Sequence, residues 1–434
     1  MDKEERKKTI CTIPWTHTAV YQNGEYGICC MCVYNSGGRL FTGDKPESVM
    51  ENDIDTVRNH PTYVELRKSM LAGEQHELCK LCWDEEALGG RHSKRQGQQH
   101  IYRDSLEKIL EIGDPTGHID VNEFPIQYLD LRLGNLCNLA CRSCGPDNSS
   151  LWLEYLGFKQ FTVGGRPGTY NISNENKVYK IVEEDFNYWK SDKFDEFLVR
   201  VLPTVNRIYF TGGEPLINKR HYQILDYCIE KGFAKNIELE YNTNGTTLNM
   251  NLLNQWREFK FVDVCFSIDA MGPLANYVRY PTDWDVIERN MRMFDDIDIP
   301  HLRGSTNATI SIFNIMHLPE FFTWFHKQKF KKFKRNLCWH RLVFPKIYNV
   351  QILPAETKKM ITEYYDNFIA NSDIPDLKHN IYNIITFMNQ EDQSIRMPEF
   401  RIMVDRQDRL RNQNVRDEVP WLGELLDSPS SWLI

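Results

Sequence analysis

Three cysteines constrain this chain more than any other feature of its sequence: Cys137, Cys141 and Cys144, with the spacing CxxxCxxC. Thiolates are soft ligands, and three of them can hold three irons of an iron-sulfur cubane. The fourth iron then has no protein ligand and is open to a small molecule. An incomplete ligand set of this kind indicates chemistry rather than a purely structural metal site.

The cysteine run follows a predicted strand over residues 126–133, in which apolar residues recur at close to every second position. The cysteines therefore lie on a loop at the carboxyl end of a strand, where barrel-type α/β folds build their active sites. In spacing and context the run resembles the cluster motif of radical S-adenosylmethionine (radical SAM) enzymes. The alternative is a zinc site that uses the three thiolates and a distant fourth ligand.

Three later segments resemble, in the same order, segments with which radical SAM enzymes bind S-adenosylmethionine. Each follows a predicted strand: Gly-Gly-Glu at 212–214, Thr-Asn-Gly at 243–245 and Ser-Ile-Asp at 267–269. Two glycines let the main chain approach a ligand closely, and a carboxylate accepts hydrogen bonds from an ammonium group. The resemblance extends over about residues 125–345. The cofactor contacts that it implies are Gly212, Gly213, Glu214, Thr243, Asn244, Ser267, Asp269 and Arg279.

Each of these segments also has a plainer interpretation. Gly-Gly-Glu-Pro is a turn sequence, small polar residues commonly end strands, and Arg279 could be a solvated loop residue. One departure from the family is Ser143, where many members carry an aromatic residue against the adenine, so the adenine contact stays unassigned. The connection from Cys144 to the second strand near Arg207 is long, with helical patterns over 150–156 and 179–201.

The N-terminal part carries a second cysteine set. Cys11 is followed by Gly24 and Cys29, and Cys79 and Cys82 form a CxxC. The set resembles the auxiliary-cluster module of twitch and SPASM radical SAM enzymes, which implies that these four thiolates hold a second [4Fe-4S] cluster. Here the module precedes the barrel, whereas in the family it usually follows it.

Several alternatives remain open for the N-terminal cysteines. Four thiolates also suit a structural zinc ion, and Cys30 or Cys32 competes with Cys29 for the ligand role. The basic segment 90–95 follows the CxxC directly and is a candidate to line the space between the module and the barrel. The remaining cysteines lie in apolar segments and are expected to be buried core thiols: Cys228, Cys265 and Cys338.

The implied fold is of the α/β class: a partial (β/α)6 TIM-type barrel with an N-terminal cysteine-rich auxiliary-cluster module and a C-terminal helical extension. The predicted parts are the twitch-like module at 1–97, a linker helix at 98–124, the barrel at 125–348 and a mainly helical region at 349–434. Within the last part, the pattern over 355–370 predicts a helix.

Composition excludes several classes of protein. With 52 basic and 60 acidic residues the net charge is −8, which argues against a general nucleic-acid scaffold. We expect no membrane association and a cytoplasmic location, because there is neither an apolar run of membrane-spanning length nor a signal peptide. Twelve cysteines in such a chain predict metal ligands in a reducing compartment rather than disulfides.

The resemblance implies a radical mechanism. An external donor of the flavodoxin or ferredoxin type supplies one electron, S-adenosylmethionine is cleaved to a 5'-deoxyadenosyl radical, and that radical removes a hydrogen atom from the substrate. We expect a net oxidation of a peptide or protein side chain, with the auxiliary cluster as electron acceptor. The alternatives are modification of a small metabolite such as a nucleotide or sugar, and a zinc-stabilised binding protein without catalysis.

Overall fold

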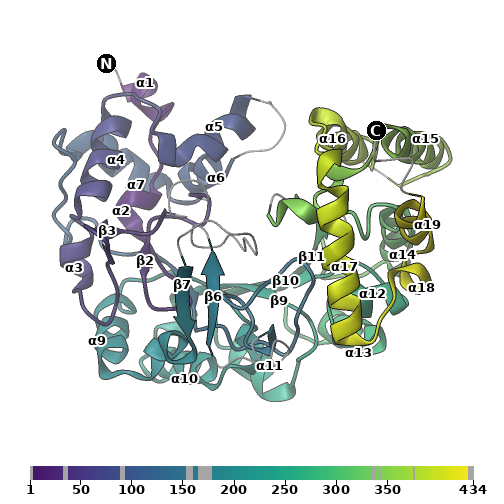
Figure 1. The fold of residues 1–434 in the computed structure, drawn as a ribbon. Helices are drawn as coiled ribbons and strands as arrows, with labels where there is room; N and C mark the ends of the chain where they lie inside the picture. Colours follow the sequence, from purple (N-terminus) through teal and green to yellow (C-terminus); the bar gives the residue numbers. More distant parts are fainter. Residues whose placement is uncertain are drawn as a thin grey trace. The chain divides into compact units, whose positions relative to one another are not determined.

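A computed structural model describes most of the chain, and its residues form two compact units (Figure 1). The described residues are 3–32, 38–87, 93–152, 160–164, 178–334, 338–342, 344–374 and 377–428. The first unit comprises Met1–Leu136, Lys159–Tyr241 and Asn254–Phe261, and the second comprises Cys137–Phe158, Asn242–Leu253 and Val262–Ile434. These units do not follow the predicted boundaries at 97, 124 and 348.

The first unit contains a mostly parallel run of strands in the order β2-β1-β5-β8-β9. Within this run, β1 and β2 pair antiparallel, and the other described neighbours pair parallel. The N-terminal segment thus contributes two strands beside the strand that leads to the cysteine run. The strands are β1 (His17–Val20), β2 (Tyr26–Gly27), β5 (Tyr128–Arg132), β8 (Arg207–Thr211) and β9 (Glu238–Thr243), the last of which ends in residues of the second unit.

Strands β8 and β9 have one fully buried face and one that is partly open. Ile208 and Phe210 are buried, whereas the alternate residues of β8 are only half-buried. The register places Asp130 opposite Tyr209, and Tyr209 opposite Glu240. Since side chains alternate across a strand, these three polar residues share one face of the sheet.

Helical segments between residues 13 and 95 contribute residues to the pocket of the N-terminal cysteines. Two buried arginines in this part of the chain, Arg58 just after a helix and Arg67 within one, donate hydrogen bonds to main-chain carbonyl groups, among them those of Trp15 and Pro14. A small hairpin, β3 (Phe41–Thr42) and β4 (Lys45–Pro46), lies in sequence between β2 and the helix Ile54–Val57. The helices are α1 (Lys3–Lys7), α2 (Ile13–Thr16), α3 (Ile54–Val57), α4 (Pro61–Leu71), α5 (Lys80–Ala87), α6 (Lys94–Ile101), α7 (Arg103–Ile112), α9 (Asp192–Val201) and α10 (Lys219–Glu230), with the 3-10 turn η2 (Glu77–Cys79) before α5.

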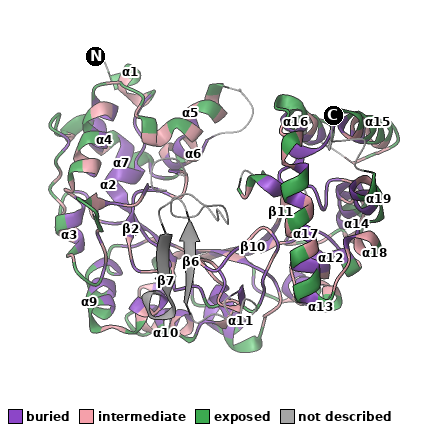
Figure 2. Ribbon diagram, viewed as in Figure 1, coloured by how far each residue is buried: buried purple, intermediate pink, exposed green. Residues whose placement is uncertain are grey.

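The second unit holds three parallel strands in the order β10-β11-β12: Phe261–Ser267, Leu302–Ile310 and Cys338–Arg341. Helices α12 (Gly272–Val278) and α13 (Trp284–Asp296) connect the first two strands, and α14 (Leu318–Gln328) precedes the third. A C-terminal set of helices follows, each with a buried and an exposed side (Figure 2). It consists of α15 (Ala355–Ala370), α16 (Leu377–Gln390), α17 (Met397–Arg411), α18 (Val415–Glu418) and α19 (Pro420–Asp427).

Alternation of strands and helices from β5 to β12, with parallel pairing, fits a partial TIM-type barrel. Helix α15 has the predicted bounds 355–370. No described helix combines the length and apolar character needed to cross a membrane.

The helix predicted over 179–201 is wrong in its first half. Val178–Val182 is a strand, β7, that pairs antiparallel with β6 (Gln160–Gly164), and a 3-10 segment at Glu183–Lys190 precedes α9. The helical pattern over 150–156 falls mostly outside the described residues. Among the expected core thiols, Cys228 is buried, but Cys265 lies on the half-buried face of β10. The Cys338 side chain is outside the described part.

Candidate functional site

The CxxxCxxC loop of the second unit is hydrogen-bonded to the end of α12 and to the segment that follows it. The Ala140 N–H donates to the carbonyl oxygen of Tyr280 at 2.5 Å, and the Arg142 N–H donates to that of Val278 at 2.8 Å. Trp152 Nε1 donates to the Cys141 carbonyl oxygen at 3.2 Å. These bonds fix the backbone around the middle cysteine, so the loop is held from both sides.

The three thiols of this loop are partly buried, and those of Cys141 and Cys137 act electrostatically on Cys144. Burial raises the pKa of Cys144, and the neighbouring thiols of Cys141 and Cys137 raise it further. The Leu139 N–H points to Cys137 Sγ at 3.4 Å. Among the described side chains, no group of three or more His, Cys, Asp or Glu could hold a metal ion as placed.

Arg279 and Asp269 form an ion pair beside the cysteine loop. Arg279 Nε donates to Asp269 Oδ2 at 2.8 Å and Nη2 donates to Oδ1 at 3.1 Å, while Nη1 lies 3.9 Å from Cys141 Sγ. Burial alone would lower the pKa of Arg279, but Asp269 and Cys141 together hold it above its usual range. The guanidinium is therefore a fixed positive charge next to a potential thiolate.

Asn244 also reaches the cysteine loop. Its Nδ2 donates to Asn138 Oδ1 at 2.9 Å and lies 4.0 Å from Cys137 Sγ. The Thr243 hydroxyl accepts from the Gly245 N–H at 3.2 Å and so shapes the turn after β9. Ser267 ends β10 on its half-buried face. The second unit thus brings Asn244, Asp269 and Arg279 to the cysteine loop, whereas Thr243 is engaged in a turn.

The Gly-Gly-Glu segment lies in the first unit, directly against the chain before Cys137. A Cβ on Gly213 would stand 2.2 Å from the Leu136 carbonyl oxygen, so only glycine fits there. The Glu214 N–H donates to the same oxygen at 2.7 Å. The Glu214 carboxylate is buried and accepts from the Leu216 N–H at 3.1 Å. This segment supports the backbone that leads into the cysteine loop.

Arg142, which sequence reasoning missed, anchors the cysteine loop from inside the motif. Its guanidinium is fully buried, pairs with Asp408 of α17 at 2.5 Å, and stacks on the Tyr277 ring with 3.6 Å to the centroid. Its Nε donates to the Tyr277 carbonyl oxygen at 2.7 Å. No local sequence pattern marks this role, because Asp408 is 266 positions away.

Replacing Arg142 by methionine is expected to lower the free energy of unfolding by about 3 to 5 kcal/mol, because Asp408 is left as a buried carboxylate without its partner. Urea unfolding followed by tryptophan fluorescence measures the loss. Arg409→Met, at an exposed position of the same helix, is the control and should change stability by about 0.5 kcal/mol or less. Equal effects of the two substitutions would contradict the anchoring role.

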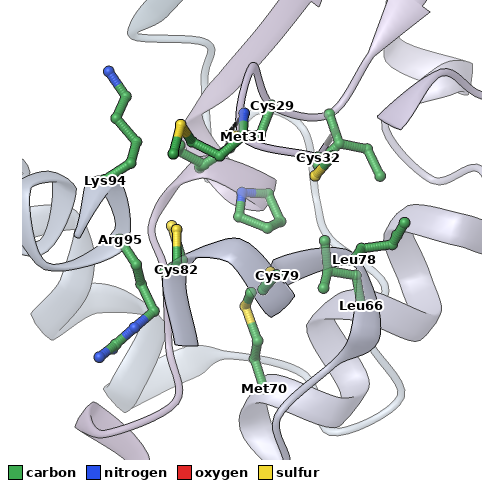
Figure 3. A pocket seen from close by; sticks show the side chains of 14 residues that line it. Cys29, Met31, Cys32, Leu66, Met70, Leu78, Cys79, Cys82, Lys94 and Arg95 are labelled. Atoms are coloured by element: carbon green, nitrogen blue, oxygen red, sulfur yellow. Dashed lines mark hydrogen bonds between the residues drawn. The ribbon is translucent and has the colours of Figure 1, made fainter. Parts of the chain in front are cut away.

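The N-terminal cysteines meet in one pocket of the first unit (Figure 3). Cys79 and Cys82 come from the η2–α5 segment, and Cys29 comes from the loop after β2. Cys11 and Cys32 also line the pocket, whereas Cys30 is not among its lining residues. All four predicted ligands are therefore brought together, and Cys32 joins them as a fifth thiol.

Burial dominates the electrostatics of this pocket. It raises the pKa of Cys11 to about 12, and the Ile13 N–H opposes the rise. Burial also raises the pKa of Cys82, and the backbone N–H of Arg95 lowers that pKa in part. Buried thiols of this kind lose their protons readily only when a metal ion stabilises the negative charge of the thiolate. Their environment is therefore more typical of metal ligands than of free nucleophiles.

Two basic residues at this pocket, Lys94 and Arg95, were not predicted as site residues. The sequence offered one signal, the basic segment 90–95 after the CxxC, of which residues 90–92 lie outside the described part. Gly24, which lies between Cys11 and Cys29 in the N-terminal cysteine set, forms the turn between β1 and β2 with φ +81°. Its position therefore reflects a tight turn that needs glycine.

Comparison with known proteins finds a match to one family model. Residues 131–323 match the model described as the Radical SAM superfamily. The matched range includes the cysteine loop and all the predicted cofactor contacts, and it covers less than half of the chain. The N-terminal cysteine pocket lies before its first residue.

Similarity to individual proteins is weak. An uncharacterized protein of Methanocaldococcus jannaschii, MJ0907, is 25% identical over 147 residues, which are 34% of this chain and 40% of that protein. A structure of native anSMEcpe with bound AdoMet is 16% identical, covers 58% of this chain and 63% of its own, and has a TM-score of 0.35. Streptococcus suis SuiB bound to precursor peptide SuiA is 12% identical, covers 71% of this chain and 63% of its own, and has a TM-score of 0.33.

This chain thus spans less than two thirds of each of these three proteins, and both TM-scores are too low to support an argument about fold or substrate. The family match does not depend on them. The CxxxCxxC spacing on a loop after a strand agrees with it. The match of residues 131–323 to the Radical SAM superfamily model supports a radical SAM enzyme, with the [4Fe-4S] cluster and S-adenosylmethionine that this family implies.

Proposed function

We propose that this protein cleaves S-adenosylmethionine reductively and uses the resulting radical to oxidise a substrate. The observation that carries the proposal is the CxxxCxxC loop, whose three partly buried thiols interact electrostatically and where a fixed guanidinium lies 3.9 Å from the Cys141 sulfur. When bound, a [4Fe-4S] cluster with S-adenosylmethionine supplies a carbon radical that removes hydrogen atoms. The residues fit such a group, because the donor set is soft and incomplete and Arg279 offsets its negative charge.

The chain's own residues bind and orient the reactants. The thiolates of Cys137, Cys141 and Cys144 are the proposed ligands. Asp269 holds Arg279 in place by two hydrogen bonds, and Asn244 keeps the loop against the end of β9 through Asn138. Glu214, Gly212 and Gly213 in the first unit, and Thr243 and Ser267 in the second, remain predicted contacts of S-adenosylmethionine.

A second cluster is part of this proposal. Cys11, Cys29, Cys79 and Cys82 line one pocket and would hold it in a twitch-like module, although the module precedes the barrel. Fully thiolate-ligated, it has no open iron and suits electron transfer. The substrate would lose a hydrogen atom, then one electron to this cluster and one proton to solvent, a two-electron oxidation. The separate electron that cleaves S-adenosylmethionine would come from an external flavodoxin or ferredoxin.

For the substrate we propose a peptide or protein side chain, as the sequence analysis expects. One observation favours the second candidate, a small polar metabolite. Tyr209 and Glu240 lie opposite each other on the half-buried face of β8 and β9. Such a face suits a ligand with many hydrogen-bonding groups.

The proposed activity is tested with anaerobically reconstituted protein, dithionite and S-adenosylmethionine, with 5'-deoxyadenosine measured by mass spectrometry. We expect formation of 5'-deoxyadenosine and about eight irons per chain for two clusters. Zinc without sulfide would establish the binding-protein alternative instead. Deuterium transfer into 5'-deoxyadenosine, from either a deuterated peptide digest or a deuterated small-molecule fraction, separates the two substrate classes.

A further inference from the structure

Helix α6 begins at the cysteine pocket of the first unit. Its first two residues, Lys94 and Arg95, lie on the pocket wall next to Cys82, and their side chains leave the helix in opposite directions (Figure 3). The Arg95 N–H is hydrogen-bonded to the Cys82 thiol. The amino end of a helix carries a partial positive charge, which stabilises nearby anions. This end of α6 therefore favours the thiolate form of the thiols that it faces.

This helix end is firmly fixed. Ser93 and Gln96 form a capping box, with 3.2 Å for each of its two bonds. Arg95 donates to Glu86 of α5 at 2.9 Å and to the Ile10 carbonyl oxygen at 3.1 Å. Helix α5 carries Cys82 and Ile10 precedes Cys11, so α6 is tied to the elements that supply two of the thiols.

The two basic side chains differ in their charge balance. Arg95 is neutralised by the Glu86 carboxylate, with which it shares a second contact at 2.5 Å. Lys94 takes part in no ion pair among the described residues, and its ammonium donates to the Tyr128 hydroxyl at 3.3 Å. The thiols of Cys30 and Cys29 lie near enough to act on the charge of Lys94, and so do the carboxylates of Glu240 and Asp130. Unlike Arg95, Lys94 is therefore not held in a close ion pair, and its positive charge acts on the thiols of this pocket as well as on those carboxylates.

We propose that Lys94 is a positioning residue for electron transfer: it raises the reduction potential of the cluster held by the N-terminal cysteines. This inference rests on the proposed function, which supplies that cluster. A fully thiolate-ligated cubane is anionic and gains one more negative charge on reduction. A fixed ammonium stabilises the reduced form more than the oxidised form, and N–H donors to the sulfurs act in the same direction.

The test is a redox titration of the full chain followed by electron paramagnetic resonance. The background is Cys137→Ala/Cys141→Ala/Cys144→Ala, so that only the N-terminal cluster contributes. Lys94→Met should lower the potential by at least the equivalent of a tenfold change in the reduction equilibrium, about 59 mV for one electron. Lys94→Arg, which keeps the charge, should retain most of the original potential. Lys94→Gln serves as the second neutral variant if the methionine variant is insoluble.

Lys80→Met is the matched control. Lys80 lies beside Cys79 in sequence, but its ammonium is exposed and paired with Asp84 at 2.7 Å. Unchanged potentials in both neutral Lys94 variants, at full iron content, would overturn the inference and leave the second cluster intact. Equal shifts for Lys80 and Lys94 would do the same. Absence of iron in the triple-alanine background would instead overturn the proposed second cluster, and the inference with it.

Discussion

Replacing Cys137, Cys141 and Cys144 together by alanine is expected to abolish reductive cleavage of S-adenosylmethionine. The loss should exceed roughly a thousandfold, because without these thiolates nothing in the loop holds the iron that binds the cofactor. Iron content should fall by about half, since the N-terminal pocket keeps its four thiols. Mass spectrometric detection of 5'-deoxyadenosine measures the activity, and iron and sulfide analysis counts the remaining cluster.

Cys228→Ala is the control for loss of a thiol. Cys228 is buried in α10 and lies outside both cysteine sets, so its replacement should leave 5'-deoxyadenosine formation and iron content unchanged. Circular dichroism and urea unfolding of the triple variant test its fold independently. If the triple variant, folded and with half its iron, still cleaved S-adenosylmethionine, the proposed role of this loop would be wrong.

Local sequence patterns located the strands around the proposed site. The strands predicted before the cysteine run, before Thr243 and before Ser267 correspond to β5, β9 and β10, and β5 at Tyr128–Arg132 lies within the predicted range 126–133. Alternation of apolar residues is a local signal, and it is strong where one face of a strand is buried. The cysteine spacing is equally local, which is why the loop could be named from sequence alone.

Features that depend on distant partners could not be read from the sequence. Val178–Val182 is a partial exception: it pairs with Gln160–Gly164, and its β-branched and aromatic residues also favour a strand locally, a signal that the helix prediction over 179–201 did not use. The position of the Arg142 side chain depends on Asp408, and that of the Lys94 side chain depends on Tyr128, which is 34 positions away in sequence. Such contacts create no periodic pattern in the chain, so the supporting residues of both cysteine sets appear first in the structure.

The second large effect is expected for the N-terminal pocket. Replacing Cys79 and Cys82 by alanine should remove about half the iron and stop substrate turnover, while cleavage of S-adenosylmethionine without turnover continues. The two thiols come from η2 and α5, three positions apart, so they line the same pocket and would bind one cluster. Without that cluster, a substrate radical has no acceptor for its electron, and oxidised product should be undetectable.

Cys30→Ala provides the matched control and tests whether Cys30 is a ligand of the N-terminal cluster. Cys30 is next to Cys29 in sequence but is not among the residues that line the pocket. Full iron content in this variant would exclude Cys30 as a ligand and leave Cys29 and Cys32, which both line the pocket, and loss of half the iron would show that Cys30 is used. For the Cys79/Cys82 variant, product formation at the unaltered rate would exclude the cluster as electron acceptor. Loss of the folded state in urea and circular dichroism measurements would assign the cluster a chiefly structural role, because metal binding at such sites also contributes to folding.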